Sequence, residues 1–312
     1  MKRIATTSPV RGCSVDDLRA IAREAEAGGF EAIFSPELPP YSAIANAQVF
    51  AEATSKIKVG TWITNIYMRR PVMCAAEALT VQEASGGRMV LGLGVSHKPV
   101  NDRFGIDMGD PIEEMYKYVL AVRSFADGSS PLLTIKRQLS SLPIYIAGLT
   151  EKTAELAGEV ADGFMPTLAT PDHIKKLTDA LRRGAKKAGR SPEDIEITNG
   201  IFSFISDDLE SAYKAAASSL VGYARLPFYQ RLFRNVGFED IADKIRSGVE
   251  PSEAFTEEFL DAMVLIGPEE RCREKLEKHR EAGVELPVIV PYPVDKQSNV
   301  EVMKRTVRAF SD

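Results

Sequence analysis

Residues 57–99 decide the fold, and their sequence is IKVGTWITNIYMRRPVMCAAEALTVQEASGGRMVLGLGVSHKP. The segment 57–64 is apolar and rich in β-forming residues, and a second apolar run spans 89–95. Between them, Pro71 suits the first turn of a helix, and Gly86-Gly87 is typical of a helix end. A strand, a helix and a second strand in this order predict a parallel βαβ unit with helices on both faces of the sheet.

The two strands of this unit end in polar residues. Thr64 and Asn65 close the first strand, and Ser96 and His97 follow the second. The carboxyl ends of parallel strands meet at one edge of the sheet, which is where α/β folds bind their ligands. We therefore expect these four side chains to lie together at a binding site.

The same alternation of apolar strands and helices continues along the chain. Six further strands are expected at 4–7, 30–34, 143–147, 162–165, 195–205 and 286–290. Eight strands alternating with helices predict an α/β fold, the (β/α)8 TIM barrel. An open doubly wound sheet would need a GxGxxG loop after its first strand, and the sequence has none there.

Two connections between strands are longer than the others. Residues 98–110, directly after His97, are expected to form a loop. Residues 206–266 are too long for one connection, so we expect a helical insertion between strands seven and eight. The whole chain, 1–312, is then expected to be a single barrel domain.

The composition excludes several classes of function. A net charge of −5 argues against a nucleic-acid binder, which carries a basic surface. Cys13, Cys74 and Cys272 show no CxxC spacing, which predicts reduced thiols and no metal site. No apolar run approaches the roughly 20 residues of a membrane span, and no signal peptide is recognisable. We expect a cytoplasmic protein whose partner is a small molecule, not a nucleic acid or a membrane.

Several short motifs occur in the order typical of one enzyme family. They are Val59-Gly60-Thr61, Thr64-Asn65-Ile66-Tyr67, Arg69-Arg70-Pro71, Ser85-Gly86-Gly87-Arg88 and Leu91-Gly92-Leu93-Gly94-Val95-Ser96-His97. Together they resemble the bacterial-luciferase-like oxidoreductases, (β/α)8 barrels that use FMN or the deazaflavin coenzyme F420. The segments LGLGVSHKP and Leu226-Pro227-Phe228-Tyr229 are most similar to the F420-using branch. The resemblance implies a homodimeric enzyme that transfers a hydride between reduced coenzyme F420 and a small organic substrate.

The resemblance also implies where the cofactor ring binds. In this family the third strand often carries a non-proline cis peptide that backs the ring, and the matching residues are Trp62 and Ile63. The alternative is that Trp62 only fills the barrel interior. Thr64, Asn65 and Ser96 are the expected polar contacts of the ring. An Asn at this place can instead serve its own loop backbone.

The cofactor phosphate needs backbone donors at a helix N-terminus. Gly148, Leu149 and Thr150 precede one predicted helix, and Thr167 lies shortly before the next. We expect these four residues to bind the phosphate. Ordinary helix capping by Thr150 is the alternative, and the two roles are compatible.

Two residues are candidates for catalysis. His97 matches a carboxylic acid to which proton supply is assigned in sugar-phosphate dehydrogenases of the F420-using branch, and an imidazole can exchange a proton near neutral pH. Those dehydrogenases carry an Asp-His pair after the second strand, where this chain has Pro36-Glu37, which argues against sugar-phosphate oxidation. Glu37 is the candidate replacement base. The alternatives are a loop-stabilising role for His97 and a salt bridge at the barrel rim for Glu37.

Two rival functions stay open at this point. The first is an FMN-dependent monooxygenase that consumes oxygen. The second is a barrel without catalytic activity that binds a phosphorylated ligand.

Overall fold

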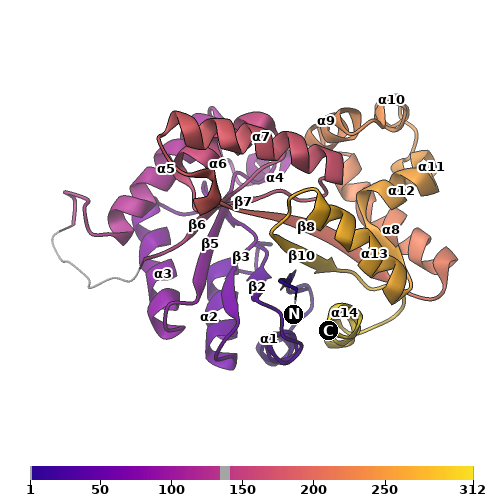
Figure 1. The fold of residues 1–312 in the computed structure, drawn as a ribbon, viewed down its shortest axis with the longest axis horizontal. Coiled ribbons are helices and arrows are strands. Elements are labelled where there is room, and N and C mark those ends of the chain that lie inside the picture. The colour runs from indigo at the N-terminus through magenta and orange to yellow at the C-terminus, as the bar shows by residue number, and fades with distance from the viewer. Residues whose placement is uncertain (1, 134–140, 312) are drawn as a thin grey trace.

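Eight parallel strands close into a barrel because β10 pairs with β1 on one side and with β8 on the other. The computed structural model describes residues 2–133 and 141–311, and in this part of the chain helices surround the barrel (Figure 1). The barrel strands are β1 (Ala5–Thr7), β2 (Ala32–Ser35), β3 (Lys58–Thr61), β5 (Met89–Gly94), β6 (Ile144–Ala147), β7 (Gly163–Met165), β8 (Glu196–Ile205) and β10 (Leu286–Pro291). The predicted (β/α)8 barrel is confirmed.

The surrounding helices begin where the sequence supplies a cap. Ser14 and Asp17 form a capping box at the first helix, and Pro71, Pro111 and Pro171 occupy first turns, where their missing N–H is not needed. The helices are α1 (Val15–Ala27), α2 (Ala43–Ala53), α3 (Pro71–Ala84), α5 (Pro111–Ala126), α6 (Glu151–Val160), α7 (Pro171–Lys187), α13 (Glu269–Glu281) and α14 (Asn299–Phe310), with a 3₁₀ turn at Pro192–Asp194. Most of the predicted bounds are correct to within two residues.

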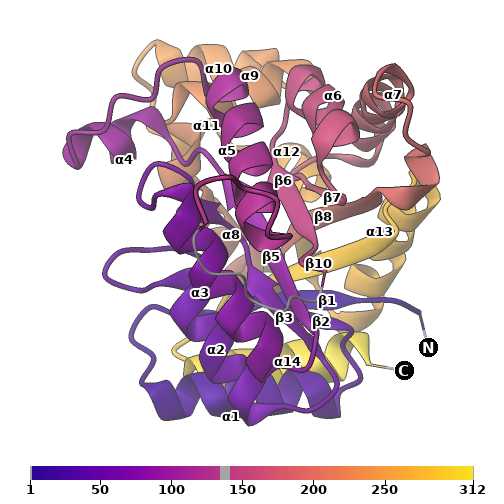
Figure 2. The same cartoon turned by 90° about the vertical axis from the view of Figure 1, so that its left-hand side faces the viewer.

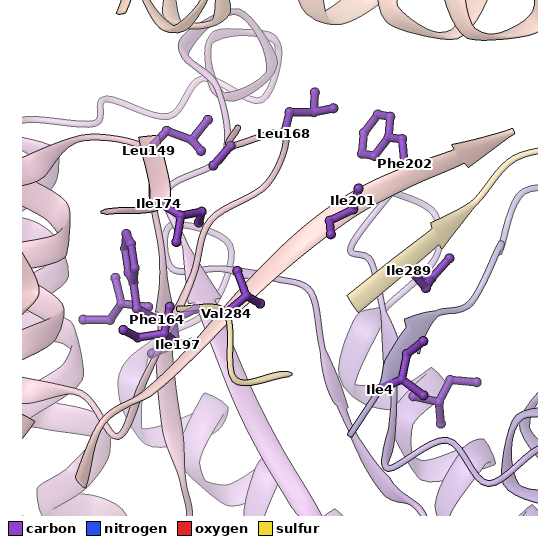
Figure 3. Packing of buried hydrophobic residues seen from close by; sticks show 14 of the residues in the cluster. Ile4, Leu149, Phe164, Leu168, Ile174, Ile197, Ile201, Phe202, Val284 and Ile289 are labelled. Carbon is purple, nitrogen blue, oxygen red and sulfur yellow. The ribbon is translucent and has the colours of Figure 1, made fainter. Parts of the chain in front are cut away.

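The apolar residues form one core inside the barrel and a larger one outside it. The outer core fills the space between strands and helices, where Phe164 of β7, Ile174 of α7 and Ile197 of β8 meet (Figure 3). The interior core consists of Ala5, Ala32, Phe34, Val90, Tyr145, Met165, Leu286 and Val288. Trp62, Ile63 and Ala147 are partly buried against this interior core. These three partly exposed residues therefore form the floor of the barrel mouth.

The predicted strand at 57–64 is interrupted by a bulge. It divides into β3 and β4 (Thr64–Asn65), and the peptide bond between Trp62 and Ile63 is cis. Gly60 lies opposite Val90 and Thr64 lies opposite Leu93, so four steps on one strand match three on β5. One extra residue in a strand bends it and redirects the side chains beside it. The residues after the bulge accordingly pair with β5 alone.

The insertion at 206–266 is helical, as predicted, but it also contains a strand that was not predicted. Its elements are α8 (Leu209–Ala224), α9 (Pro227–Asn235), α10 (Glu239–Arg246), α11 (Pro251–Ala254), α12 (Glu257–Met263) and β9 (Leu265–Gly267). Strand β9 pairs with the carboxyl end of β8. Figure 2 shows α9, α10 and α11 at the upper end of the molecule.

The expectation of a loop at 98–110 is partly wrong, because the short helix α4 (Lys98–Arg103) starts directly after His97. Helix α4 lies at the same end of the molecule as α9 (Figure 2). Both therefore border the carboxyl ends of the strands. Within the described part of the chain, no helix has the length and apolar character required to cross a membrane.

Candidate active site

The floor of the mouth is formed by the bulge in the third strand. Trp62 and Ile63 occupy space that two glycines leave open: a Cβ on Gly94 would lie 2.5 Å from Ile63 Cγ1, and one on Gly200 would lie 2.8 Å from Trp62 Cζ2. The Trp62 indole N–H donates to Thr167 Oγ1 at 3.0 Å. The structure thus brings three of the predicted cofactor residues, Trp62, Ile63 and Thr167, into one surface.

Asn65 is held by a network that sequence reasoning did not foresee. Its amide nitrogen donates to Asn101 Oδ1 at 2.9 Å, and Asn101, which is fully buried, donates in turn to the Val95 carbonyl at 2.8 Å. The Asn65 side-chain oxygen accepts from the Tyr67 N–H at 3.1 Å. Asn65 therefore serves its own loop and couples it to α4, which is the alternative role considered above.

Thr64 differs from its neighbour. Its hydroxyl is fully buried and has no hydrogen-bond partner among the described residues. A buried hydroxyl without a partner is unusual in a native protein. Of the two residues of β4, Thr64 is therefore the one with an unused hydrogen-bonding group.

Glu37 is part of a buried ion pair. One carboxylate oxygen accepts from the Arg69 guanidinium at 2.6 Å, and the other accepts from the Asn65 N–H at 2.9 Å. The Glu37 and Arg69 side chains are only 5% and 16% exposed. Burial lowers the pKa of Arg69, but the carboxylates of Glu37 and Glu77 outweigh this effect and raise it. Because both oxygens of Glu37 are engaged, its contacts favour positioning of the β4 backbone over proton transfer.

His97 and Ser96 stand at the end of β5. Ser96 has a φ of 55°, a conformation that few residues other than glycine adopt, and it turns the chain into α4. The His97 ring lies against two rings of α9, with centroids 5.5 Å from Tyr229 and 6.3 Å from Phe228. Burial lowers the pKa of His97. The imidazole is therefore neutral over a wider pH range than a free histidine.

A pocket with a cavity volume of about 180 Å³ opens at the N-terminus of α6. Leu149 and Thr150 line it on one side, and Arg231 and Arg234 of α9 line it on the other. The unpaired N–H groups of a helix start and the guanidinium groups both favour an anion. Arg234 is also paired with Asp243, which leaves Arg231 as the cation of the pocket without an ion pair among the described residues.

Thr150 and Gly148 also have roles in the fold. The Thr150 hydroxyl caps α6 by accepting from the Thr153 N–H at 3.2 Å. A Cβ on Gly148 would lie 2.2 Å from Thr153 Cγ2, so any side chain at Gly148 would displace that cap. The requirement for glycine at this position comes from packing against α6.

Three residues of the mouth were missed from the sequence. Asn101, Arg231 and Tyr229 lie in helices α4 and α9, which follow loop-like or mixed sequence. The signals available were Pro99 and Pro227 at the two helix starts and the family-like segment 226–229, which indicated the cofactor class but no site residue. Among the described residues, no group of three or more His, Cys, Asp or Glu side chains lies close enough to hold a metal ion.

Comparisons with known proteins agree with this architecture. Residues 3–286 match the profile of the family described as luciferase-like monooxygenase. The 5,10-methylenetetrahydromethanopterin reductase of Methanolobus tindarius is 27% identical over 254 residues, covering 76% of this chain and 78% of that protein. A putative coenzyme F420-dependent oxidoreductase of Mycobacterium tuberculosis is 26% identical over 304 residues, covering 85% and 88%.

A solved structure has the same fold along its whole length. It is the coenzyme F420-dependent tetrahydromethanopterin reductase of Methanopyrus kandleri, with a TM-score of 0.80 and 21% identity. The match covers 99% of this chain and 98% of that one. At this level of identity the likeness establishes the fold alone.

Proposed function

The chain belongs to the luciferase-like monooxygenase family of oxidoreductases, and we propose that it transfers a hydride between reduced coenzyme F420 and a small organic substrate. Two curated relatives support this reaction: one is a reductase, and the other is described as F420-dependent. When bound, the deazaflavin supplies the hydride chemistry. The residues of this chain bind the cofactor, orient the substrate and exchange protons with it.

The observation that carries the proposal is that an apolar floor and a pocket suited to an anion, at the N-terminus of α6, occur together at the carboxyl ends of the strands. Trp62 and Ile63 offer a partly exposed apolar surface for a planar ring, and the glycines at 94 and 200 leave room for these two side chains. Thr64 adds an unused hydroxyl at the strand end. The α6 N-terminus and Arg231 offer donors for a phosphate. The donor set thus fits a phosphorylated ring cofactor.

His97 is the group proposed to exchange a proton with the substrate. It follows the strand that borders the floor, and burial keeps its imidazole neutral. A neutral imidazole accepts a proton, and the imidazolium that forms can donate it again. Glu37 is assigned a positioning role, because it holds the Asn65 backbone beside the floor.

Cofactor titration tests the proposal against the FMN-dependent monooxygenase. We expect F420 to bind at least about tenfold tighter than FMN, a difference of about 1.4 kcal/mol. Reduced enzyme should consume no oxygen beyond the background rate. Tighter FMN binding together with substrate-dependent oxygen uptake would replace this proposal with the monooxygenase. Failure of both cofactors to bind would favour a barrel without redox activity.

Arg231→Ala locates the phosphate within this experiment. Loss of one charge-assisted contact should weaken F420 binding about tenfold. Arg225→Ala is the matched control, because Arg225 lies in the same insertion but pairs with Glu250 at the surface. Equal effects of the two substitutions on F420 binding would refute the assignment of the cofactor phosphate to the α6 pocket.

A further inference from the structure

A continuous series of aromatic rings crosses the barrel mouth. It starts at Phe204 and Phe202 of β8, whose centroids lie 5.1 and 4.9 Å from Tyr292, just beyond β10. Phe202 follows Ile201 in β8, and successive side chains of a strand point to opposite faces of the sheet. From Phe202 the series continues at 5.3 Å to Tyr223 of α8.

The series then descends to β5 on the other side of the barrel. Tyr223 is 5.0 Å from Tyr229, which is 5.7 Å from Phe228 and 5.5 Å from His97. We call these rings the aromatic arch; its members are Phe202, Phe204, Tyr223, Phe228, Tyr229, Tyr292 and His97. In the closed sheet, β6 and β7 separate β5 from β8. The arch therefore spans the mouth above the floor, and the insertion supplies its centre.

The arch carries no formal charge at neutral pH. Burial raises the pKa of Tyr223, Tyr229 and Tyr292, so these hydroxyls stay protonated. Burial also lowers the pKa of His97, so the imidazole stays neutral. Ring faces present negative electrostatic potential, which opposes an anion lying against them.

The Tyr229 hydroxyl is the unused polar group of the arch. The Tyr229 side chain is 5% exposed overall, and its hydroxyl has no hydrogen-bond partner among the described residues. This hydroxyl is also not one of the fully buried polar atoms without a partner, so a ligand can reach it. The hydroxyls of Tyr223 and Tyr292, in contrast, influence each other's pKa, so the two groups lie close together. The Tyr229 hydroxyl is therefore available to a ligand at a place where the ring of His97 is its neighbour.

We propose that the substrate binds under this arch, above the cofactor ring that the Trp62–Ile63 floor supports, and that it is an uncharged molecule with an apolar body and one oxygen that bonds to the Tyr229 hydroxyl. The inference rests on the proposed function and specifies its substrate class. Burying an unpaired carboxylate under neutral rings is strongly unfavourable, whereas a ketone or alcohol needs only one hydrogen bond. Tyr229 is then a specificity-determining residue.

Two cations near the arch lie outside the proposed substrate site. Arg231 stacks on Phe228 with its guanidinium carbon 5.8 Å from the ring centroid, and it faces the α6 pocket. Arg11 follows β1 at the rim and is exposed, so solvent screens its charge. The Glu37–Arg69 pair is internally neutralised. None of these groups supplies a buried counter-charge for an anionic substrate.

Two probes of similar size and opposite prediction test the inference: acetophenone, a neutral ketone, and benzoate, an anion. Their binding is measured by ligand-observed NMR on the protein with and without F420. We expect acetophenone to bind at least about tenfold tighter than benzoate. Tyr229→Phe should weaken acetophenone binding about three- to tenfold, the usual effect of losing one hydrogen bond. Tyr116→Phe, an exposed tyrosine of α5, is the matched control and should change nothing.

The outcomes separate this inference from the proposed function. Benzoate binding as tight as acetophenone, and lost in Arg11→Gln, would assign the proposed substrate site to an anion and overturn the inference. Binding of neither probe, or equal effects of Tyr229→Phe and Tyr116→Phe, would also overturn it. Failure of F420 to bind would instead contradict the proposed function, while the probe preference stays measurable on the cofactor-free protein.

Discussion

Substitution of Arg69 tests whether the Glu37–Arg69 pair is structural. In Arg69→Met the Glu37 carboxylate, 5% exposed, keeps only the hydrogen bond from the Asn65 N–H. Removing one partner of a buried ion pair destabilises a protein by about 3–5 kcal/mol. Because Arg69 is 16% exposed rather than fully buried, we expect the lower limit, about 3 kcal/mol. Chemical denaturation followed by circular dichroism measures the loss.

Glu37→Gln gives the complementary measurement. The glutamine still accepts from the Asn65 N–H, and Arg69 keeps its contact with Glu77 at 2.9 Å. We therefore expect a smaller loss, about 2 kcal/mol, typical of one hydrogen bond to a charged group. Turnover should fall only as far as cofactor or substrate binding is weakened.

The control is Lys98→Met, which removes the exposed ion pair of Lys98 with Asp102 and should cost less than about 1 kcal/mol. Equal losses in Arg69→Met and Lys98→Met would refute the structural role of the buried pair. A Glu37→Gln variant with normal stability and normal F420 affinity but no turnover would make Glu37 the catalytic base. Either result would reverse the assignment made from its contacts.

Two further predictions concern catalysis and assembly. His97→Ala should lower kcat at least about 100-fold, with F420 affinity changed less than about fivefold. Burial lowers the pKa of His97, so activity that needs the neutral imidazole should persist below pH 6.5 and fall only as the pH drops through the lowered pKa. The His97→Ala variant should lose this pH dependence. A pH profile that is the same in the variant would exclude His97 as the proton-exchanging group. Val72 and Met73 are 40% and 53% exposed on α3, and exposed apolar side chains are typical of an interface. Met73→Glu should therefore convert the expected homodimer to a monomer, as measured by light scattering, whereas Val15→Glu on α1 should not. A parent protein that is already monomeric would contradict the expected dimer.

The barrel could be predicted from the sequence because its signals are local. The apolar run at 89–95 and the proline and glycine boundaries of α3 are legible without knowledge of their neighbours, and both elements lie where predicted. Short elements were the failures. Helix α4 has six residues and strand β9 has three, too few to show a period.

The site could be predicted only in outline. The ends of β4 and β5 were identified correctly, but the roles of Asn65 and Glu37 were left between two alternatives. The contacts with Asn101 and Arg69 favour the structural alternative for both. These partners lie 36 and 32 positions away, and no local pattern in a single sequence pairs them.

The family resemblance identified the floor as a site but only separate pieces of the arch, namely His97 and the segment 226–229. The floor depends on one short segment, around Trp62, whose motif is recognisable in the sequence. The arch joins residues of β8, α8 and α9 with two residues just beyond β10 and β5, and these are separated by up to 195 positions, His97 to Tyr292. Its rings meet only because the insertion folds back over the mouth. On the proposals above, the barrel strands hold the cofactor ring, Arg231 of the insertion helps to hold its phosphate, and Tyr229 selects the substrate. We therefore expect changes at Tyr229 to alter the substrate preference and to leave the choice of cofactor unchanged.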